Sequence, residues 1–476
     1  MLEGLEISVL NLSDVLDDNK TKRFDSEFFK KEYLEIDNNI SSNEYKRLLT
    51  LCEKITDFGA FSQNNFIEYK EEGNHYFIRN QDIENSFIKD DKIFIEKDVY
   101  EKLSLKLNEF DLLLQRTGSI GKSGLVLKKD LPSSANQNLA QIKPNLTKIN
   151  PYFLNVFLNS LIGQKIFERL ATGNVQPWLN LGQIESIKIP SFSEKNQLKI
   201  EKLVKESQNG LNTSKQTYSQ AENLLLQEIG FADYKASIES VNVKNFSDSF
   251  RKSCRLDAEY YSKVSEDLIL KIKNNQFELL GNICTIRRGN FISKTFYTED
   301  KKGTCYLRGG DFSSNHIKDD KTIFVSNKFN PSNEYRTEVG DILIALIGSV
   351  GTLGIVTDKF ADSYISNNIG IIKITDKQFL TEYIHLFLTS SLGKILFDKI
   401  EMRTAQPKIS DKDIYEFPIP KLDIKKQQQI ADLVEQSFAL KKKSEQLLEV
   451  AKKAVELAIE ENEELALNYI NQETNE

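Results

Sequence analysis

The sequence contains few of the residues that build metal centres and disulfide frameworks. Four cysteines occur among 476 residues, and none of them forms a Cys-x-x-Cys pair. The three histidines, His75, His316 and His385, are far apart in the chain and near no recognisable metal or catalytic motif. This scarcity argues against a zinc site and against a disulfide-stapled fold, and it fits a reducing cytoplasm.

Long apolar runs are also missing. The longest lies near residues 342–356, where it is too short and too rich in glycine to cross a bilayer. No signal peptide is visible at the start of the chain. We therefore expect a cytoplasmic protein that has no membrane contact.

Complete signatures of nucleotide-binding enzymes and methyltransferases are missing too. The segment Gly121-Lys122-Ser123 resembles the end of a phosphate-binding loop, but that motif needs a glycine at the position of Arg116. The segment 330–333, Asn-Pro-Ser-Asn, only begins like the Asn-Pro-Pro-aromatic signature of methyltransferases. We therefore expect a tight β-turn at Gly121 and no catalytic residue in this chain.

The net charge of the chain does not exclude nucleic acid binding. The formal charge is −7, which is unusual for a protein that binds nucleic acid. From Ala454 onward the chain carries seven glutamates and no lysine or arginine, so the residues before it are neutral overall. A neutral region can still carry a basic face, and nucleic acid binding therefore stays possible.

One stretch occurs twice. Residues 110–126 and 340–356 share an aspartate, an apolar run and three glycines, each pair 230 positions apart. Each copy predicts a buried strand, a glycine turn and a second short strand. Further matches at the same offset are Asn138/Asn368, Gly163/Gly393, Phe167/Phe397, Gln176-Pro177/Gln406-Pro407, Ile184/Ile414 and Pro190/Pro420. Upstream, residues 23–29, 79–82 and 88–92 resemble residues 255–261, 308–311 and 317–321.

These matches predict that the chain consists of two tandem copies of one unit, which meet near residue 235. The first globular unit is expected over residues 46–190, after a lead-in strand in residues 1–17 and a helix over 24–40. Its strands are expected at 76–78, 92–95, 112–114 and 140–142, and its helix at 151–170, where Pro151 fits the first turn. The second globular unit is expected over 276–420, with a helix near 380–398.

Two long helices are expected, at residues 194–229 and 424–467. In the first, Ser207, Ser214 and Ala221 recur every seven residues, and small residues also stand 230 positions later in the second. Small residues at one heptad position allow close helix approach, so we predict that these rods, about 50 Å long, pack on each other. The alternative is two separate amphipathic helices, each lying on its own domain.

This ordered set of features closely resembles the specificity subunit of Type I restriction-modification systems. The resemblance covers nearly the full length and also rests on the matching unit ends, 187–190 and 417–420, and on Gln427-Gln428-Gln429-Ile430. It implies an α+β fold with a tandem duplication of a globular target recognition domain followed by a long helix, the two helices packed as an antiparallel coiled coil. The expected parts are the first domain with its lead-in (1–192), the first spacer helix (193–232), the second domain (233–422), the second spacer helix (423–467) and an acidic tail (468–476).

The resemblance also implies the function. Each domain would read one half of a split site in double-stranded DNA, and the helices would set the gap between the halves. The chain itself would not be catalytic and would bind no cofactor. It would hold two modification subunits that use S-adenosylmethionine, and restriction subunits that use ATP and Mg²⁺ would join in the full complex. Two alternatives stay open: a scaffold that binds no DNA, and a methyltransferase or nuclease with unrecognised motifs.

DNA contacts need basic or amide side chains on exposed loops. In the first unit we predict Arg79, Lys89, Gln115, Arg116, Lys122, Ser123, Asn136 and Gln137. In the second we predict Arg287, Arg288, Asn290, Lys294, Arg308, Lys318 and Arg403, with the 287–290 turn as the strongest candidate. Aligned pairs that differ, such as Arg116/Leu346 and Lys122/Thr352, are better candidates for sequence reading than pairs that match. The alternative for each is a solvated surface side chain.

Overall fold

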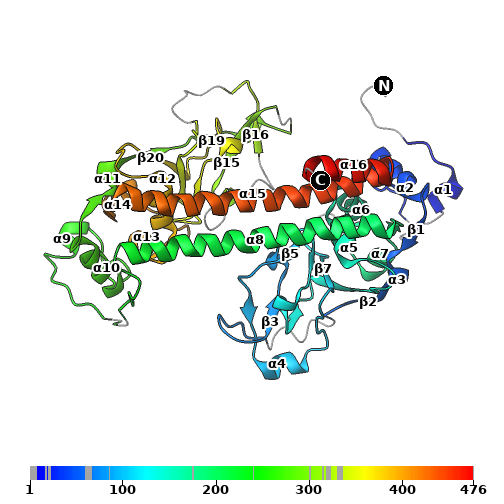
Figure 1. The fold of residues 1–476 in the computed structure, drawn as a ribbon, viewed down its shortest axis with the longest axis horizontal. Coiled ribbons are helices and arrows are strands. Elements are labelled where there is room, and N and C mark those ends of the chain that lie inside the picture. Colours follow the sequence, from blue (N-terminus) through cyan, green and yellow to red (C-terminus); the bar gives the residue numbers. More distant parts are fainter. Residues whose placement is uncertain are drawn as a thin grey trace. The chain divides into compact units, whose positions relative to one another are not determined.

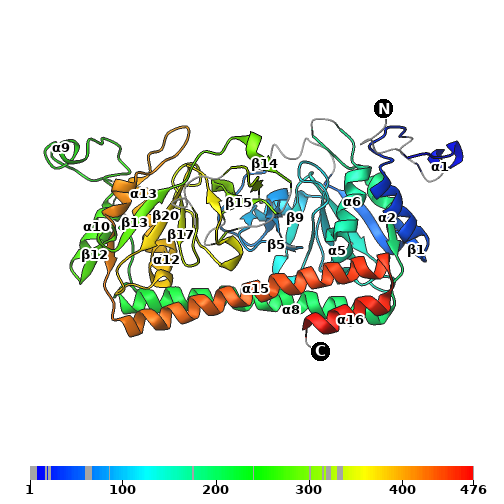
Figure 2. The ribbon, with the colours of Figure 1, turned by 90° about the horizontal axis from the view of Figure 1, so that it is seen from above.

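The protein forms two compact units. Unit 1 comprises residues 1–211 and 441–476, and unit 2 comprises residues 212–440. The computed structural model describes residues 8–16, 19, 23–58, 67–84, 86–173, 176–237, 239, 241–299, 302–312, 316–317, 323–329 and 336–474 (Figures 1 and 2). Among these residues, no helix is long and apolar enough to cross a membrane.

The described residues of unit 1 form three sheets. The largest runs β2-β10-β7-β8-β5-β4, a second runs β6-β3-β9, and β1 pairs with β11. Its strands are β1 (Tyr45–Arg47), β2 (Cys52–Asp57), β3 (Tyr76–Ile78), β4 (Ile83–Glu84), β5 (Phe87–Ile88), β6 (Ile93–Phe94), β7 (Leu112–Gln115), β8 (Ser123–Leu125), β9 (Ser133–Ala135), β10 (Leu139–Pro144) and β11 (Lys188–Pro190). The four predicted strands of this unit are confirmed, with ends shifted by one or two residues.

Helices cover one face of the large sheet of unit 1 (Figure 1). They are α2 (Lys31–Ser41), α3 (Leu48–Leu51), α5 (Pro151–Asn159), α6 (Leu161–Leu170), α7 (Leu181–Glu185), part of α8 (Glu194–Glu228), part of α15 (Ile424–Glu460) and α16 (Glu463–Thr474). The other two helices of this unit are α1 (Leu12–Leu16) and α4 (Lys97–Lys102), and α4 packs against the second core described next. Leu112 and Leu114 of β7 pack toward α5, whereas Leu113 packs into a second core with Phe77 of the smaller sheet. The strand is therefore buried on both faces, as its unbroken apolar run predicts.

Unit 2 repeats this plan. One sheet runs β13-β20-β17-β18, another runs β14-β16-β15-β19, and β12 pairs with β21. Its strands are β12 (Phe277–Leu279), β13 (Cys284–Arg288), β14 (Tyr297–Thr298), β15 (Thr304–Leu307), β16 (Ile323–Val325), β17 (Ile342–Ala345), β18 (Leu353–Ile355), β19 (Tyr364–Ile365), β20 (Ile369–Ile374) and β21 (Pro418–Pro420). Its helices are α9 (Phe250–Ser253), α10 (Lys263–Lys273), α11 (Leu280–Ile283), α12 (Thr381–Thr389), α13 (Ser391–Ile400), α14 (Asp411–Tyr415) and the remaining parts of α8 and α15.

The predicted helices over 151–170 and 380–398 are each interrupted by a serine. Ser160 ends α5 and caps α6, because its hydroxyl accepts a hydrogen bond from the Gly163 amide at 3.2 Å. Ser390 does the same for Gly393 in unit 2 at 3.4 Å. A Cβ at Gly163 or Gly393 would lie 2.2 Å from a backbone carbonyl oxygen, so both bends need glycine.

Other sequence predictions need correction near the termini. The lead-in strand is wrong: residues 8–11 form no strand and residues 12–16 form α1, while residues 1–7 lie outside the described part. The helix expected over 24–40 begins at Lys31, because residues 26–29 form turns instead. The first long helix is confirmed as α8. The second ends at Glu460, and α16 follows where the acidic tail was expected, with Ile470 only 2% exposed.

Segments of α8 and α15 pack on each other within each unit. In unit 1, the Ser207 and Ser444 hydroxyls lie 3.1 Å apart, and Ser444 Oγ donates to the Ser207 carbonyl at 2.6 Å. In unit 2, Ser214 and Ser437 each donate a hydroxyl hydrogen bond to the other's carbonyl at 2.8 Å. All four serines are at most 4% exposed, so the small side chains do permit close approach in both places. The paired segments run antiparallel in each unit (Figure 1).

Candidate nucleic-acid interface

The glycine turn joins two antiparallel strands in each unit. In unit 1 it follows β7, and Gly118 and Gly121 adopt φ values of 75° and 91°. The Gly121 amide donates to the Gln115 carbonyl at 2.8 Å, which closes the turn. In unit 2 the turn after β17 is closed in the same way, by the amide of Gly351 and the carbonyl of Ala345 at 3.0 Å. The predicted strand–turn–strand is confirmed in both units.

A second loop lies beside the glycine turn in each unit. In unit 1, the Leu179 amide donates to the Arg116 carbonyl at 2.9 Å, and Trp178 bridges to Thr117. In unit 2, the corresponding bond joins Ile409 to Leu346 at 2.9 Å, and Lys408 bridges to Ile347. We call the glycine turn and this loop together the turn face; it comprises residues 117–122 and 176–178 in unit 1, and 347–352 and 406–408 in unit 2.

The short turn after β3 also reaches the turn face of unit 1. Asn80 Nδ2 donates to the Thr117 carbonyl at 2.7 Å, and Gln115 Nε2 donates to the Asn80 carbonyl at 2.6 Å. In unit 2 the same place is taken by Gly309, which lies near the Ile347 carbonyl. Three chain segments thus meet at this surface in unit 1, and their main chains are held by hydrogen bonds rather than by their exposed side chains.

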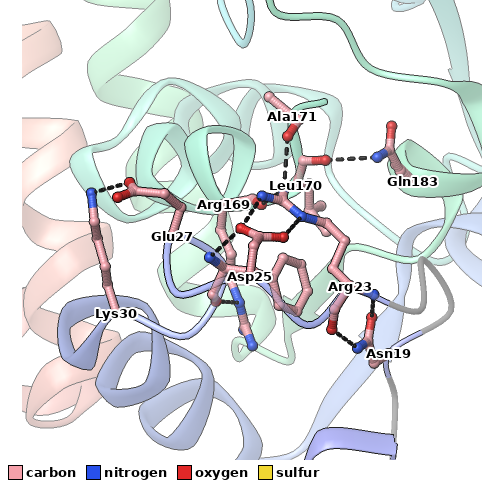
Figure 3. A network of polar contacts seen from close by, with 10 residues as sticks. Asn19, Arg23, Asp25, Glu27, Lys30, Arg169, Leu170, Ala171 and Gln183 are labelled. Atoms are coloured by element: carbon pink, nitrogen blue, oxygen red, sulfur yellow. Dashed lines mark hydrogen bonds and ion pairs between the residues drawn. The ribbon is translucent and has the colours of Figure 1, made fainter. Parts of the chain in front are cut away.

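An arginine anchor fixes the chain that enters the second loop (Figure 3). Arg23 Nη1 donates to the carbonyls of Arg169 and Ala171 at 3.0 and 2.8 Å, and the guanidinium also pairs with Asp25. In unit 2, Arg255 donates to the carbonyls of residues 400 and 401 and pairs with Asp257. These carbonyls end α6 and α13, where a cation is favourable. The nearby arginine lowers the pKa of each aspartate.

An aspartate holds the base of each hairpin. Asp111 Oδ2 accepts from the Asn108 amide at 2.7 Å, and Asp341 Oδ2 accepts from the Glu338 amide at 2.8 Å. Both side chains are at most 5% exposed, and burial raises the pKa of each carboxyl. The shared aspartate therefore serves the fold, and it lies at the end of the hairpin away from the turn face.

Two predicted DNA contacts are buried in unit 1, and a third, Arg116, is half-buried. Gln115 is 3% exposed and Ser123 is fully buried, with its hydroxyl 2.6 Å from Asn155 Oδ1. Arg116 donates to the Leu179 carbonyl at 3.1 Å and pairs with Asp57. These side chains hold segments of the unit together, so the prediction that they contact DNA is revised.

Several predicted arginines and lysines are paired with acidic side chains. Arg79 and Arg308 each donate to the aspartate three positions on, Asp82 and Asp311, which explains why this pair matches between the repeats. Other predicted residues pair as follows: Lys89 with Glu84 at 3.9 Å, Arg288 with Asp411 at 2.9 Å, and Arg403 with Glu401 and Glu259 at 3.5 and 3.8 Å. The 287–290 segment is not a turn, because Arg287 and Arg288 end edge strand β13.

The other predicted residues that the structure describes are at least partly exposed. Lys122, Arg287 and Lys294 are exposed, and Asn136, Gln137 and Asn290 are partly exposed. Only Lys122 among these belongs to the turn face as defined here. Lys318 lies outside the described residues.

The sequence reading overlooked two exposed residues of the turn face. Trp178, the only tryptophan of the chain, is 42% exposed, and Lys408 stands in its place in unit 2. The repeat itself indicated both residues, because Trp178 directly follows Gln176-Pro177 and Lys408 directly follows the matching Gln406-Pro407. Within the described residues, no group of three or more histidine, cysteine, aspartate or glutamate side chains is placed to hold a metal ion.

A family model matches part of the chain. Residues 272–450, which include most of the globular part of unit 2, match the Type I restriction modification DNA specificity domain. Among curated proteins, none matches the chain.

Solved structures give matches of low similarity. The S subunit of a Type I restriction-modification system from M. genitalium is 13% identical, with 90% of this chain and 95% of that chain covered and a TM-score of 0.36. The HsdS subunit from Thermoanaerobacter tengcongensis is 15% identical, with 88% and 97% covered and a TM-score of 0.29. The resemblance to Type I specificity subunits predicted from the sequence is confirmed by the family match, over residues 272–450.

Proposed function

We propose that this chain is the DNA specificity subunit of a Type I restriction-modification complex. The observation that carries the proposal is the match of residues 272–450 to the DNA specificity domain of these systems. The proposal extends to unit 1 because its hairpin, its second loop and its arginine anchor recur in unit 2 with several hydrogen bonds at aligned positions. The chain then contains two target recognition domains that arose by tandem duplication, each of which reads one half of a bipartite DNA site.

The long helices would act as the spacer between the two readers. The buried serine pairs support this role, because Ser207/Ser444 in unit 1 and Ser214/Ser437 in unit 2 are the same pair under the 230-residue offset. Two symmetry-related contacts of this kind are what an antiparallel coiled coil built from duplicated helices requires. A fixed helix pair would hold the distance between half-sites constant.

Catalysis would belong to the partners of this chain, in the cytoplasm. Two modification subunits would bring S-adenosylmethionine and methylate adenine, and restriction subunits would bring ATP and Mg²⁺. The specificity chain would supply the DNA contacts and the docking surface.

The test is a genome-wide map of methylated adenine. Cells that carry this gene and its neighbouring modification gene are compared with cells that lack only this gene. The proposal predicts a bipartite motif that disappears with the deletion. Methylation that persists unchanged, or S-adenosylmethionine binding by the purified chain alone, would contradict it.

A further inference from the structure

The turn face has the same backbone but different exposed side chains in the two units. Several of its main-chain hydrogen bonds recur at aligned positions, such as Leu179 to Arg116 and Ile409 to Leu346, both at 2.9 Å. At two aligned positions of the turn face the side chains change: exposed Trp178 becomes exposed Lys408, and exposed Lys122 becomes partly exposed Thr352. Substituting an exposed side chain while the main-chain hydrogen bonds stay the same changes what the surface can bind. It does not change the fold.

Other exposed residues of the turn face are the same in both units. Ser119 and Ser349 are exposed on the glycine turn, and Gln176 and Gln406 are exposed on the second loop. Hydroxyl and amide groups of this kind bond well to phosphate oxygens, which carry no sequence information. The turn face thus combines polar residues that are the same in both units with a variable pair of positions, 122/352 and 178/408, at which the units differ.

The chemistry of the variable pair suits base reading. An exposed indole offers a flat face for stacking and one N–H donor, whereas lysine offers a charged donor to base acceptors or phosphates. Gly118 and Gly348 have nothing near the place of a Cβ, so both turns are open to a ligand. Arg79, Arg308 and Arg288, which lie outside the turn face, pair with aspartates.

We propose that the turn face of each unit reads its DNA half-site, and that Lys122 and Trp178 in unit 1 and Thr352 and Lys408 in unit 2 determine which half-site is read. This inference rests on the proposed function. It assigns DNA specificity to aligned positions on the backbone that both units share. Exchanging these side chains between the units should therefore change which half-site each unit recognises.

The experiment measures discrimination by the assembled complex with modification subunits. A duplex that carries both half-sites competes with duplexes in which one half is scrambled. Two exchange variants are compared with the natural chain: Lys122→Thr with Trp178→Lys in unit 1, and Thr352→Lys with Lys408→Trp in unit 2. Lys128→Thr is the matched control, because Lys128 is an exposed lysine beyond the opposite end of β8.

Each exchange variant should lose discrimination at one half-site, by about tenfold, and keep discrimination at the other. The two variants should affect different halves, and the control should affect neither. Unchanged discrimination at both halves, or an equal loss at both halves in either variant, would overturn the inference. A natural complex that does not discriminate between the duplexes would instead refute the proposed function, so the two failures are distinguishable.

Discussion

The hairpins of the two units share a backbone but are filled with different side chains. In unit 1, Ser123 bonds to Asn155 at 2.6 Å, and Asn159 Nδ2 donates to the Ser123 carbonyl at 2.9 Å. The residues 230 positions later are Leu353, His385 and Thr389, with Leu353 1% and His385 0% exposed. A buried polar cluster in one unit is therefore replaced by a more apolar cluster in the other.

This difference shows that main-chain hydrogen bonds, glycines and the arginine anchor set the frame. The side chains that point into the unit and those that point to solvent can then differ between the units, each as a set. The interior changes with its packing partners, and the exterior changes with what it binds. The comparison predicts that features common to both units are the costly ones to remove, and that unit-specific features can be exchanged only as complete sets.

The largest effect is expected where both units need the same glycine. In Gly163→Ala and Gly393→Ala, the new methyl group would lie 2.2 Å from a backbone carbonyl oxygen, which cannot move aside alone. We expect a loss of about 3 kcal/mol or more in the unfolding free energy of the unit concerned. Chemical denaturation followed by circular dichroism measures it. Gly310→Ala is the control, because nothing lies within 4 Å of its Cβ position; an equal loss there would contradict the explanation.

Replacing one side chain of the hairpin interior in unit 1 by its counterpart from unit 2 should reduce stability somewhat less than the glycine substitutions. Ser123→Leu alone would place a leucine against Asn155 and Asn159 and would leave polar groups unsatisfied, at about 2 kcal/mol. The triple variant, which adds Asn155→His and Asn159→Thr, rebuilds the interior of unit 2 inside unit 1. We expect the triple variant to recover at least half of the stability lost by Ser123→Leu, measured by thermal unfolding. A triple variant less stable than the single variant would show that the interiors are not exchangeable sets.

Replacing the buried serines of the long helices should have a similar or smaller effect. Ser214→Leu and Ser444→Leu would overpack a close helix contact and remove hydroxyl bonds, at roughly 1–3 kcal/mol each. The two costs should agree, since the contacts are equivalent. Gln216→Leu and Gln446→Leu, which are exposed on the same helices, serve as controls. Unaltered stability and unaltered half-site spacing in both serine variants would contradict the paired-helix spacer.

The smallest expected effect concerns pH. Burial raises the pKa of Asp341, so the folded chain holds this proton more tightly than the unfolded chain. Stability from this group is therefore greatest at low pH and declines as pH rises from about 3.9, the usual aspartate value, through the raised pKa. Asp341→Asn should reduce that decline in the unfolding free energy, and Asp111→Asn should do the same in unit 1. A decline as steep as in the natural chain would contradict this assignment.

The sequence predicted the features that repeat along the chain. The hairpins, the helix α8 and the serine contacts followed from apolar runs, heptads and the 230-residue offset. The breaks at Ser160 and Ser390 were missed, because one serine inside a long apolar run does not interrupt the helical pattern. Only the carbonyls that approach Gly163 and Gly393 make the bend evident.

The candidate site was less predictable, because exposure depends on partners distant in sequence. Ser123 follows a lysine in a glycine-rich turn and reads as a loop residue, but its partners Asn155 and Asn159 come more than 30 positions later and bury it. Arg116 is likewise paired with Asp57, on a neighbouring part of the sheet. Trp178 was not predicted, because the prediction considered basic, amide and hydroxyl side chains and no aromatic ones.

The most direct test replaces residues 46–190 by residues 276–420 of the same chain, a segment of equal length. If the two units are equivalent readers on one frame, methylated-adenine mapping should show a bipartite motif with two identical half-sites, both matching the half-site assigned to unit 2. An unchanged motif, or a new half-site that differs from that of unit 2, would contradict the account.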